Sequence, residues 1–393
     1  MKSRMLKTIV SAVMALTLAV MCMPLVSAID YGGDCGEGLT WSYSVETGEL
    51  KIEGTGSMDE YEYREVPWID FVDDIIKVTV CEGVEYVSEE AFSCLDYMEE
   101  ISLPSTTNTV GEGFINNFSC KKITVADANP YNSSDENGAL YDKNKTTLMI
   151  YPSGSGATEF TVPATVREIR DEAFAYAYNL KSVTLPDGLL EIGDMAFHKT
   201  ELLEKIEIPD SVIEIGYSAF EESGIESVKL PSSLVKIEEH TFTSCTKLSA
   251  VTIPDSVKVI GEGAFSDCEA LKTVTVPKSV TTIAVTAFEE CPAEINYTGS
   301  QADWEKIKLT DEYDVGMEMF KALKVNYDFK TEAQTTSAEK VQDDNTAKED
   351  KSSENKMIII VASVAVLLVV IIAAIALMIV SKGKNKNKEY KTK

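Results

Sequence analysis

The sequence predicts a repeat solenoid of about ten short parallel strands, and three observations predict it. An isoleucine lies six residues, and a phenylalanine eleven residues, after each of a series of prolines. Just before each proline the chain reads apolar-x-apolar, the period-two pattern of a strand with one buried face. The prolines recur at a period near 23 residues, at Pro163, Pro186, Pro209, Pro231, Pro254 and Pro277. Because no single repeat can bury its face alone, the repeats must stack on one another.

The first strand of each repeat predicts an exposed polar surface. The apolar-x-apolar pattern occurs ten times between Val78 and Tyr297, so the middle residue of each strand should point to solvent. These middle residues are Thr79, Ser102, Thr124, Thr161, Thr184, Glu207, Lys229, Thr252, Thr275 and Asn296. We expect them to form a polar ladder that binds a partner, although the β propensity of Thr alone would also account for its prevalence. The opposite charges of Glu207 and Lys229 could simply pair with each other.

The rest of each repeat must return the chain to the next strand. The conserved spacing places isoleucines at Ile169, Ile192, Ile215, Ile237, Ile260 and Ile283, and phenylalanines at Phe174, Phe197, Phe220, Phe242, Phe265 and Phe288. We expect an irregular or short helical arc that carries these residues inward. At about 4.8 Å per strand, ten strands make a sheet of roughly 45 Å.

The repeats resemble a known family. Residues 208–216 leading to Ala219-Phe220, and residues 265–271, are similar to the BspA-type leucine-rich repeats of bacterial surface proteins. The resemblance covers about residues 35–328 and implies a leucine-rich-repeat-like array that binds partners at the cell surface. This sequence lacks the Asn ladder of better-known leucine-rich repeats, so the resemblance does not imply their horseshoe curvature.

The array, expected over residues 78–297, should have caps and one interruption. Residues 29–77 contain two strand patterns around Thr47-Gly48 and predict an N-terminal capping hairpin. Between two repeats the spacing widens, which predicts a hairpin inserted at residues 130–158. Residues 298–330 predict a C-terminal cap with a short helix around Trp304 and a last strand near residues 323–327.

Both ends of the chain have the composition of targeting segments. Residues 1–28 have a basic start, an apolar run and a Val-Ser-Ala end, which predict a secretory signal peptide. Residues 357–380 contain no charged residue and would form a helix of roughly 36 Å, enough to span a membrane. Residues 381–393 are basic and should remain cytoplasmic, with the repeats outside. Residues 331–356 are polar and predict a disordered stalk.

No LPxTG-type motif precedes the apolar segment. A membrane anchor is therefore favoured over a wall-linked one, and the surface is expected to be that of a Gram-positive bacterium.

The charge of the chain excludes one class of partner. The formal net charge is −28, and about −36 lies on residues 8–380 once the basic ends are set aside. So acidic a surface repels nucleic acid.

The sequence offers little catalytic chemistry. Its two histidines, His198 and His240, fall on return arcs about two repeats apart and are interpreted as exposed residues. Glu168, Glu191 and Glu214 recur in phase and are interpreted as a solvated carboxylate ladder. No nucleophile and base occur together, so we expect neither an enzyme, a cofactor nor a metal site.

Cysteines are the remaining reactive groups. Cys245, Cys268 and Cys291 recur every 23 residues, three after the repeat phenylalanine, which predicts buried free thiols at a structural position. Cys35 and Cys81 could form a disulfide between the N-terminal cap and the first strand, because an exported protein permits one.

Three functions remain open at this stage. The first is an adhesin-like surface protein that binds host extracellular proteins or other cell surfaces. The second is a glycan-capturing module of a polysaccharide system, which requires exposed aromatic residues on one face, and the predicted ladder has none. The third, a surface enzyme, lacks a catalytic set.

Overall fold

The structure is a computed structural model that describes residues 31–111, 113–115, 118–310 and 317–330. The chain divides into two compact units, Met1–Phe329 and Lys330–Lys393, and every described residue but Lys330 belongs to the first. The predicted signal peptide, stalk, membrane span and basic tail (1–28, 331–356, 357–380 and 381–393) lie outside the described residues. Within the described ranges, no helix has the length and apolar character needed to cross a membrane.

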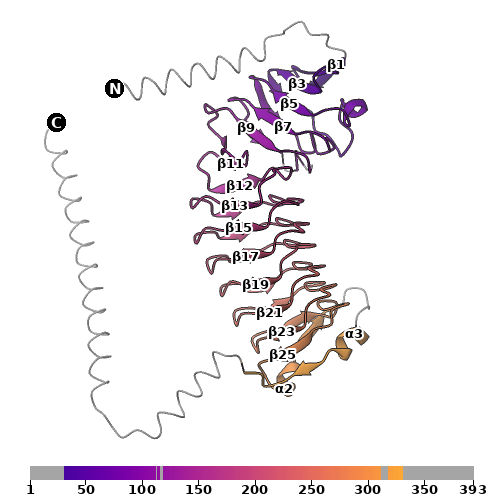
Figure 1. Cartoon of the computed structure of the whole chain (residues 1–393), viewed down its shortest axis with the longest axis vertical. Helices are drawn as coiled ribbons and strands as arrows, with labels where there is room; N and C mark the ends of the chain where they lie inside the picture. The colour runs from indigo at the N-terminus through magenta and orange to yellow at the C-terminus, as the bar shows by residue number, and fades with distance from the viewer. Residues whose placement is uncertain (1–30, 112, 116–117, 311–316, 331–393) are drawn as a thin grey trace, which may run out of the picture. The chain divides into compact units, whose positions relative to one another are not determined.

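The first strands of the repeats form what we call the front sheet (Figure 1). They pair in parallel, one repeat to the next, in three runs. The runs are β3 (Glu49–Gly54), β5 (Lys77–Val80), β7 (Glu100–Leu103) and β9 (Lys122–Val125); β13 (Glu159–Thr161), β15 (Ser182–Thr184), β17 (Lys205–Glu207) and β19 (Ser227–Lys229); and β21 (Ala250–Thr252), β23 (Thr273–Val276), β25 (Glu294–Tyr297) and β27 (Val325–Asn326). The predicted solenoid of about ten turns is therefore confirmed.

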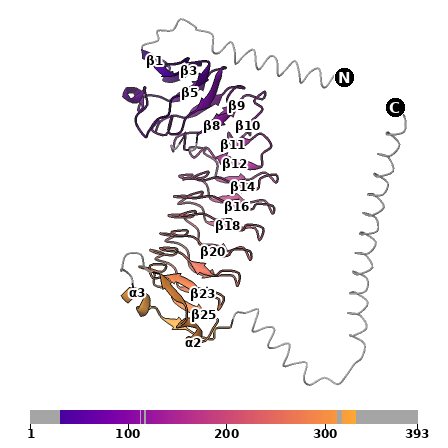
Figure 2. The same cartoon turned by 180° about the vertical axis from the view of Figure 1, so that it is seen from behind.

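The return arcs were expected to be irregular or short helical, and the helical alternative is wrong for the described repeats. Each arc instead contributes a second short strand, and these strands pair in parallel to form what we call the arc sheet (Figure 2). Its strands are β4 (Gly56–Ser57), β6 (Val84–Val87) and β8 (Thr109–Val110); β12 (Thr147–Ile150), β14 (Glu168–Ile169), β16 (Glu191–Ile192) and β18 (Glu214–Ile215); and β20 (Lys236–Ile237), β22 (Val259–Ile260), β24 (Thr282–Ala284) and β26 (Lys308–Thr310). The repeat isoleucines are the buried residues of these strands.

The phenylalanine part of each arc is held by tight turns. From Phe174 to Phe265, the residues two before and two after each repeat phenylalanine adopt left-handed backbone angles, for example Met195 (φ 53°) and Lys199 (φ 55°) around Phe197. Their N–H groups donate to carbonyls of the next repeat, Met195 to Tyr217 at 2.8 Å and Lys199 to Glu221 at 2.8 Å. The left-handed conformation costs an L-residue roughly 1–2 kcal/mol, and these hydrogen bonds offset that cost.

Aromatic rings fill the interior of the regular repeats. Phe197 and Phe220 have parallel rings with centroids 5.1 Å apart, and Phe220 and Phe242 follow at 5.5 Å. The stack runs unbroken from Phe174 to Phe288, with neighbouring planes within 7° of one another. The repeat phenylalanines are at most 4% exposed. A 23-residue period therefore places identical rings at the same point in successive turns.

The N-terminal cap is an antiparallel sheet whose last strand, β3, is also the first strand of the front sheet. β1 (Tyr31–Gly36) and β2 (Leu39–Ser44) pair antiparallel, β2 pairs with β3, and β3 pairs in parallel with β5. A short 3-10 helix, η1 (Ile69–Phe71), follows Trp68. Trp68 is fully buried and stacks on Phe92, with ring centroids 5.7 Å apart. Trp68 thus belongs to the core of the cap and the first repeats.

A short antiparallel unit lies between β9 and β13. β10 (Asn132–Ser134), β11 (Leu140–Asp142) and β12 pair antiparallel, and β12 then continues the arc sheet through β14. Before the hairpin, the buried Asn129 amide nitrogen donates to the carbonyls of Pro104 and Thr107, each at 2.8 Å. Its amide oxygen accepts from the N–H groups of Tyr131 and Asn132. Asn129 thus ties the insertion to the repeat before it.

The C-terminal cap contains the short helix that the sequence predicts. α2 (Gln301–Trp304) begins at Ser300, whose hydroxyl accepts a hydrogen bond from the N–H of Asp303. A second helix, α3 (Met317–Ala322), precedes β27. Trp304 packs on Tyr297 and on Phe320, with centroids 5.1 and 6.0 Å away, and covers this end of the interior.

Candidate binding surface

The predicted ladder lies on the outer face of the front sheet, and we call its ten residues the strand-face ladder. Within the runs they pair in register, as Thr161 with Thr184, Glu207 with Lys229, and Thr252 with Thr275. Six of the ten side chains are exposed and three are half-buried. The apolar residues that flank them point inward, so the strand phase predicted from the sequence is correct.

Thr79 is the exception within the ladder. It is buried, at 7% exposure, and its hydroxyl donates to Glu49 Oε1 at 2.6 Å. Glu49 begins β3 of the N-terminal cap, and Lys77 also contacts this carboxylate at 3.2 Å. These contacts lower the pKa of Glu49 despite its partial burial, which acts in the opposite direction. The cap therefore covers Thr79 and removes it from the binding surface.

The charged centre of the ladder is arranged differently from the simple pair considered above. Lys229 makes its ion pair with Asp210, Nζ to Oδ2 at 3.1 Å, and the structure shows no ion pair between Lys229 and Glu207 in this described region. Asp210 also accepts a hydrogen bond from the N–H of Ser232 at 3.0 Å, and this bond, with Lys229, lowers its pKa. Glu207 thus remains available to a partner.

A shallow groove of roughly 520 Å³ lies at this centre of the front sheet. Thr184, Lys205, Glu207, Asp210 and Lys229 are among the residues that line it. It therefore offers both charges and hydroxyl groups within one patch. Groups of this kind orient a partner more than they supply affinity.

The arc sheet carries the carboxylate ladder that the sequence predicts. Glu168 pairs with Glu191, and Glu191 with Glu214, in register. Partial burial and then the neighbouring carboxylates raise the pKa of Glu191. No group of three or more His, Cys, Asp or Glu that could hold a metal is present in the described part of the chain.

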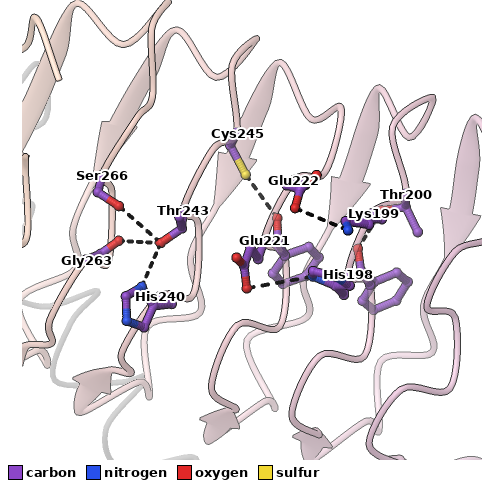
Figure 3. Close-up of polar contacts among 12 residues, drawn as sticks. His198, Lys199, Thr200, Glu221, Glu222, His240, Thr243, Cys245, Gly263 and Ser266 are labelled. Carbon is purple, nitrogen blue, oxygen red and sulfur yellow. Dashed lines mark hydrogen bonds and ion pairs between the residues drawn. The ribbon is translucent and has the colours of Figure 1, made fainter. Parts of the chain in front are cut away.

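The two histidines belong to separate arcs and make separate contacts (Figure 3). The side chain of His198 is only 12% exposed, with Nδ1 3.7 Å from Glu221 Oε2, and burial lowers its pKa. His240 Nδ1 lies 3.2 Å from the hydroxyl of Thr243. The expectation that both are exposed is therefore wrong, because each ring packs beside a tyrosine, Tyr176 or Tyr217, of the preceding repeat.

The periodic cysteines occupy a structural position, as predicted. The thiol of Cys245 donates to the carbonyl of Phe220 at 3.1 Å (Figure 3), and the thiol of Cys268 donates to the carbonyl of Phe242 at 3.2 Å. Both are fully buried and Cys291 is half-buried. Burial raises the pKa of Cys268 to about 12. Cys35 and Cys81 are buried thiols in the structure and do not form the disulfide considered above.

An exposed aromatic cluster lies on the arcs, and sequence reasoning missed it. Phe118 lies 5.1 Å from Tyr176 and 6.2 Å from Tyr178, measured between ring centroids, and the two tyrosines lie 6.1 Å apart. Phe118 lies between β8 and β9, and both tyrosines follow Phe174. The cluster therefore joins residues nearly 60 positions apart, out of phase with the repeat, so no periodic signal marks it.

The fold and its polar front face define a β-solenoid repeat protein with little helix. The family model described as "BspA type Leucine rich repeat region" matches residues 72–155 and 156–294 in six copies, more than half of the chain. The chain therefore belongs to the BspA-type leucine-rich repeat family. The matched model describes a repeat and not a catalytic domain. The comparison with curated proteins found no match.

Several solved structures are similar to this chain. A leucine-rich repeat protein from Eubacterium ventriosum is 22% identical, with a TM-score of 0.46, over 77% of this chain and 96% of that one. A leucine rich cell surface protein from Faecalibacterium prausnitzii is 24% identical, with a TM-score of 0.43, over 61% and 64% of the two chains. The pneumococcal vaccine antigen PcpA is 15% identical, with a TM-score of 0.42, over 76% and 98%.

Proposed function

We propose that the chain is a surface-displayed, adhesin-like protein whose strand-face ladder binds host extracellular proteins or the surfaces of other cells. One observation carries the proposal: nine of the ten ladder side chains lie outside the core, although each sits between inward-pointing residues of a rigid sheet. Stability therefore constrains these nine positions little. The identities of these nine residues can therefore be determined by a binding partner.

The form of the surface supports a protein partner. The ladder presents hydroxyl, amide and charged groups at a spacing of about 4.8 Å per repeat, which suits extended contact with another macromolecule. The groove around Lys205, Glu207 and Lys229 supplies a central point where charge can fix the register of that partner.

The ends of the sequence support display outside the cell. A secretory signal at 1–28, a stalk at 331–356 and a membrane span at 357–380 would tether the repeats to the outer side of the cytoplasmic membrane. The basic residues 381–393 would stay in the cytoplasm, and the surface would be that of a Gram-positive bacterium.

A glycan-capturing module is the second candidate. The strand-face ladder contains no aromatic residue, which disfavours glycan binding there. The aromatic cluster of Phe118, Tyr176 and Tyr178 on the arcs favours a glycan site on another face.

The test of the proposal is a binding screen against immobilised extracellular-matrix proteins and intact host cells. A double variant, Thr184→Arg with Thr252→Arg, places two long charged side chains on the ladder. The matched control is Ile213→Arg, which adds the same residue at a site that is 60% exposed outside the front sheet. We expect the double variant to lose at least about tenfold in affinity and the control to bind normally. Equal binding by all three proteins would remove the ladder from the binding surface.

A further inference from the structure

The cluster of Phe118, Tyr176 and Tyr178 is unusual because its rings contact one another at the surface. Phe118 is 44% exposed and both tyrosines are half-buried. The rings of Phe118 and Tyr176 meet edge to face at an interplanar angle of 70°. The interior of the array is already filled by the phenylalanine stack, so the cluster is not needed to complete the core. Its rings are available to a ligand.

Polar groups border the cluster and hold it in place. Lys199 Nζ lies 5.7 Å from the ring centroid of Tyr176, and the His198 ring packs edge-on against the same tyrosine at 5.5 Å. Partial burial, followed by the charge of Glu201, raises the pKa of Tyr178. The Tyr178 hydroxyl therefore stays protonated at neutral pH and can donate a hydrogen bond.

A pocket of roughly 430 Å³ is formed by residues next to the cluster in the chain. Its lining includes Ala175, which precedes Tyr176, and Cys120, which is two residues after Phe118. The volume is within the range of small-molecule sites. The pocket lies where the arc sheet is interrupted, between the ends of β8 and β12, which belong to separate sheets.

The charged groups of this pocket are almost all carboxylates. Among the described residues that line it are the carboxylates of Glu89, Glu90, Asp171, Glu172 and Asp194, and one cation, Arg170. Two of them are fixed by backbone donors: Asp171 Oδ1 accepts from the N–H of Asp194, and Asp194 Oδ1 from the N–H of Tyr217, both at 2.7 Å. Each carboxylate can accept several hydrogen bonds, so capacity remains for the hydroxyl groups of a ligand.

We propose that the aromatic cluster and this pocket together bind an uncharged carbohydrate. A sugar ring has an apolar C–H face that packs on aromatic rings and a rim of hydroxyl groups that donate to carboxylates. The excess of carboxylates repels polyanionic glycans. The site lies on the arcs, apart from the ladder, and the proposal rests on the second candidate function, a glycan-capturing module, whose ligand class it specifies.

Affinity electrophoresis of the purified chain tests this proposal, because so acidic a protein migrates readily in native gels. The gels contain a soluble neutral polysaccharide (galactomannan, xyloglucan or mixed-linkage β-glucan) or the polyanion hyaluronate. We expect retardation by at least one neutral polymer and none by hyaluronate. Raising the salt from about 0.05 to 0.5 M should leave the retardation unchanged, because salt screens only ionic contacts.

Variants assign the retardation to the cluster. Phe118→Ala and Tyr178→Ala should each weaken binding about tenfold. Melting temperatures equal to that of the parent chain would show that both variants keep the fold. The matched control is Tyr97→Ala, which removes a tyrosine that is 58% exposed elsewhere, and the ladder variant of Thr184 and Thr252 should also bind the polymer normally. The proposal is overturned if no neutral polymer retards the chain, if both cluster variants are retarded like the parent, or if binding is confined to hyaluronate or abolished by salt.

Discussion

Among single residues, the repeat phenylalanine contributes most to the interior of the array. Each ring is buried and parallel to the rings of the repeats before and after it. The sequence was sufficient to predict this, because a bulky apolar residue at an invariant offset can only be stacking in the core. The polar outer face of the front sheet could also be predicted, from the apolar-x-apolar alternation of its strands.

Phe220→Ala tests the stack at its centre. The substitution removes a fully buried ring that lies 5.1 Å from Phe197 and 5.5 Å from Phe242, so we expect a loss of about 3–5 kcal/mol in the free energy of unfolding. Urea or thermal unfolding measures it. Thr184→Ala on the outer face is the control and should change stability by less than about 0.5 kcal/mol. A larger loss for Thr184→Ala than for Phe220→Ala would reverse the assignment of the two faces.

Glu191→Gln tests the carboxylate ladder. Because the folded-state pKa of Glu191 is raised, its ionised form destabilises the folded chain, and this penalty disappears as the pH falls through that pKa. We expect the variant to gain about 0.5 kcal/mol at pH 7 and to match the parent below about pH 4, near the ordinary pKa of a glutamate. Unfolding at the two pH values gives the comparison, with Glu136→Gln, off the ladder, as control. A gain that persists at the lower pH would point to a cause other than charge.

The arcs could not be predicted from single residues. Tight left-handed turns are usually marked by Gly, yet here those positions hold residues such as Glu172, Met195, Ser218 and Lys199. Gly263 is the exception, and a Cβ at that residue would come within 2.5 Å of His240 Nδ1. Because no glycines mark the other turns, the turns could not be recognised in the sequence, and irregular or short helical arcs were expected. The backbone conformation of the arcs is instead determined by hydrogen bonds between neighbouring repeats, which join residues far apart in the sequence.

Among the secondary-structure elements, the caps were predicted by position and the contacts between distant elements were not. The hairpin of β2 and β3 and the helix α2 lie where local patterns place them. The covering of Thr79 by Glu49, however, joins two elements about 30 residues apart. The aromatic cluster was missed for the same reason, since nothing in the sequence shows that Phe118 approaches Tyr176.

Trp68→Ala tests the N-terminal cap. Removal of this buried ring uncovers Phe92, and we expect a loss of about 3–5 kcal/mol. In a repeat array each turn contacts only its neighbours, so hydrogen exchange should quicken in β5 and β6 before it does in β23 and β25. Trp304→Ala at the other cap provides the matched variant and should give the opposite order. Uniform quickening in both variants would show that the array unfolds as one cooperative unit.

For the molecule as a whole, the proposed display outside the cell depends on the predicted anchor. Deletion of residues 357–393 should release a folded, soluble repeat domain into the medium, because the described residues from 31 to 329 include both caps and two hydrophobic core clusters. Immunoblots of medium and cells measure the release, and protease treatment of intact cells should cut the full chain within residues 331–356. If the truncated chain stayed on the cells, a second attachment would have to exist.

The most direct test of the binding role uses a cysteine placed on the ladder. Six of the seven cysteines in the described part of the chain are buried, so a surface thiol reagent should label Thr184→Cys selectively. Labelling rates are measured with and without the partner found by the binding screen, and Ile213→Cys serves as the control outside the front sheet. We predict that saturating partner slows labelling at position 184 about tenfold or more and leaves position 213 unchanged. Unchanged labelling at position 184 under the same conditions would contradict a binding surface on the strand-face ladder.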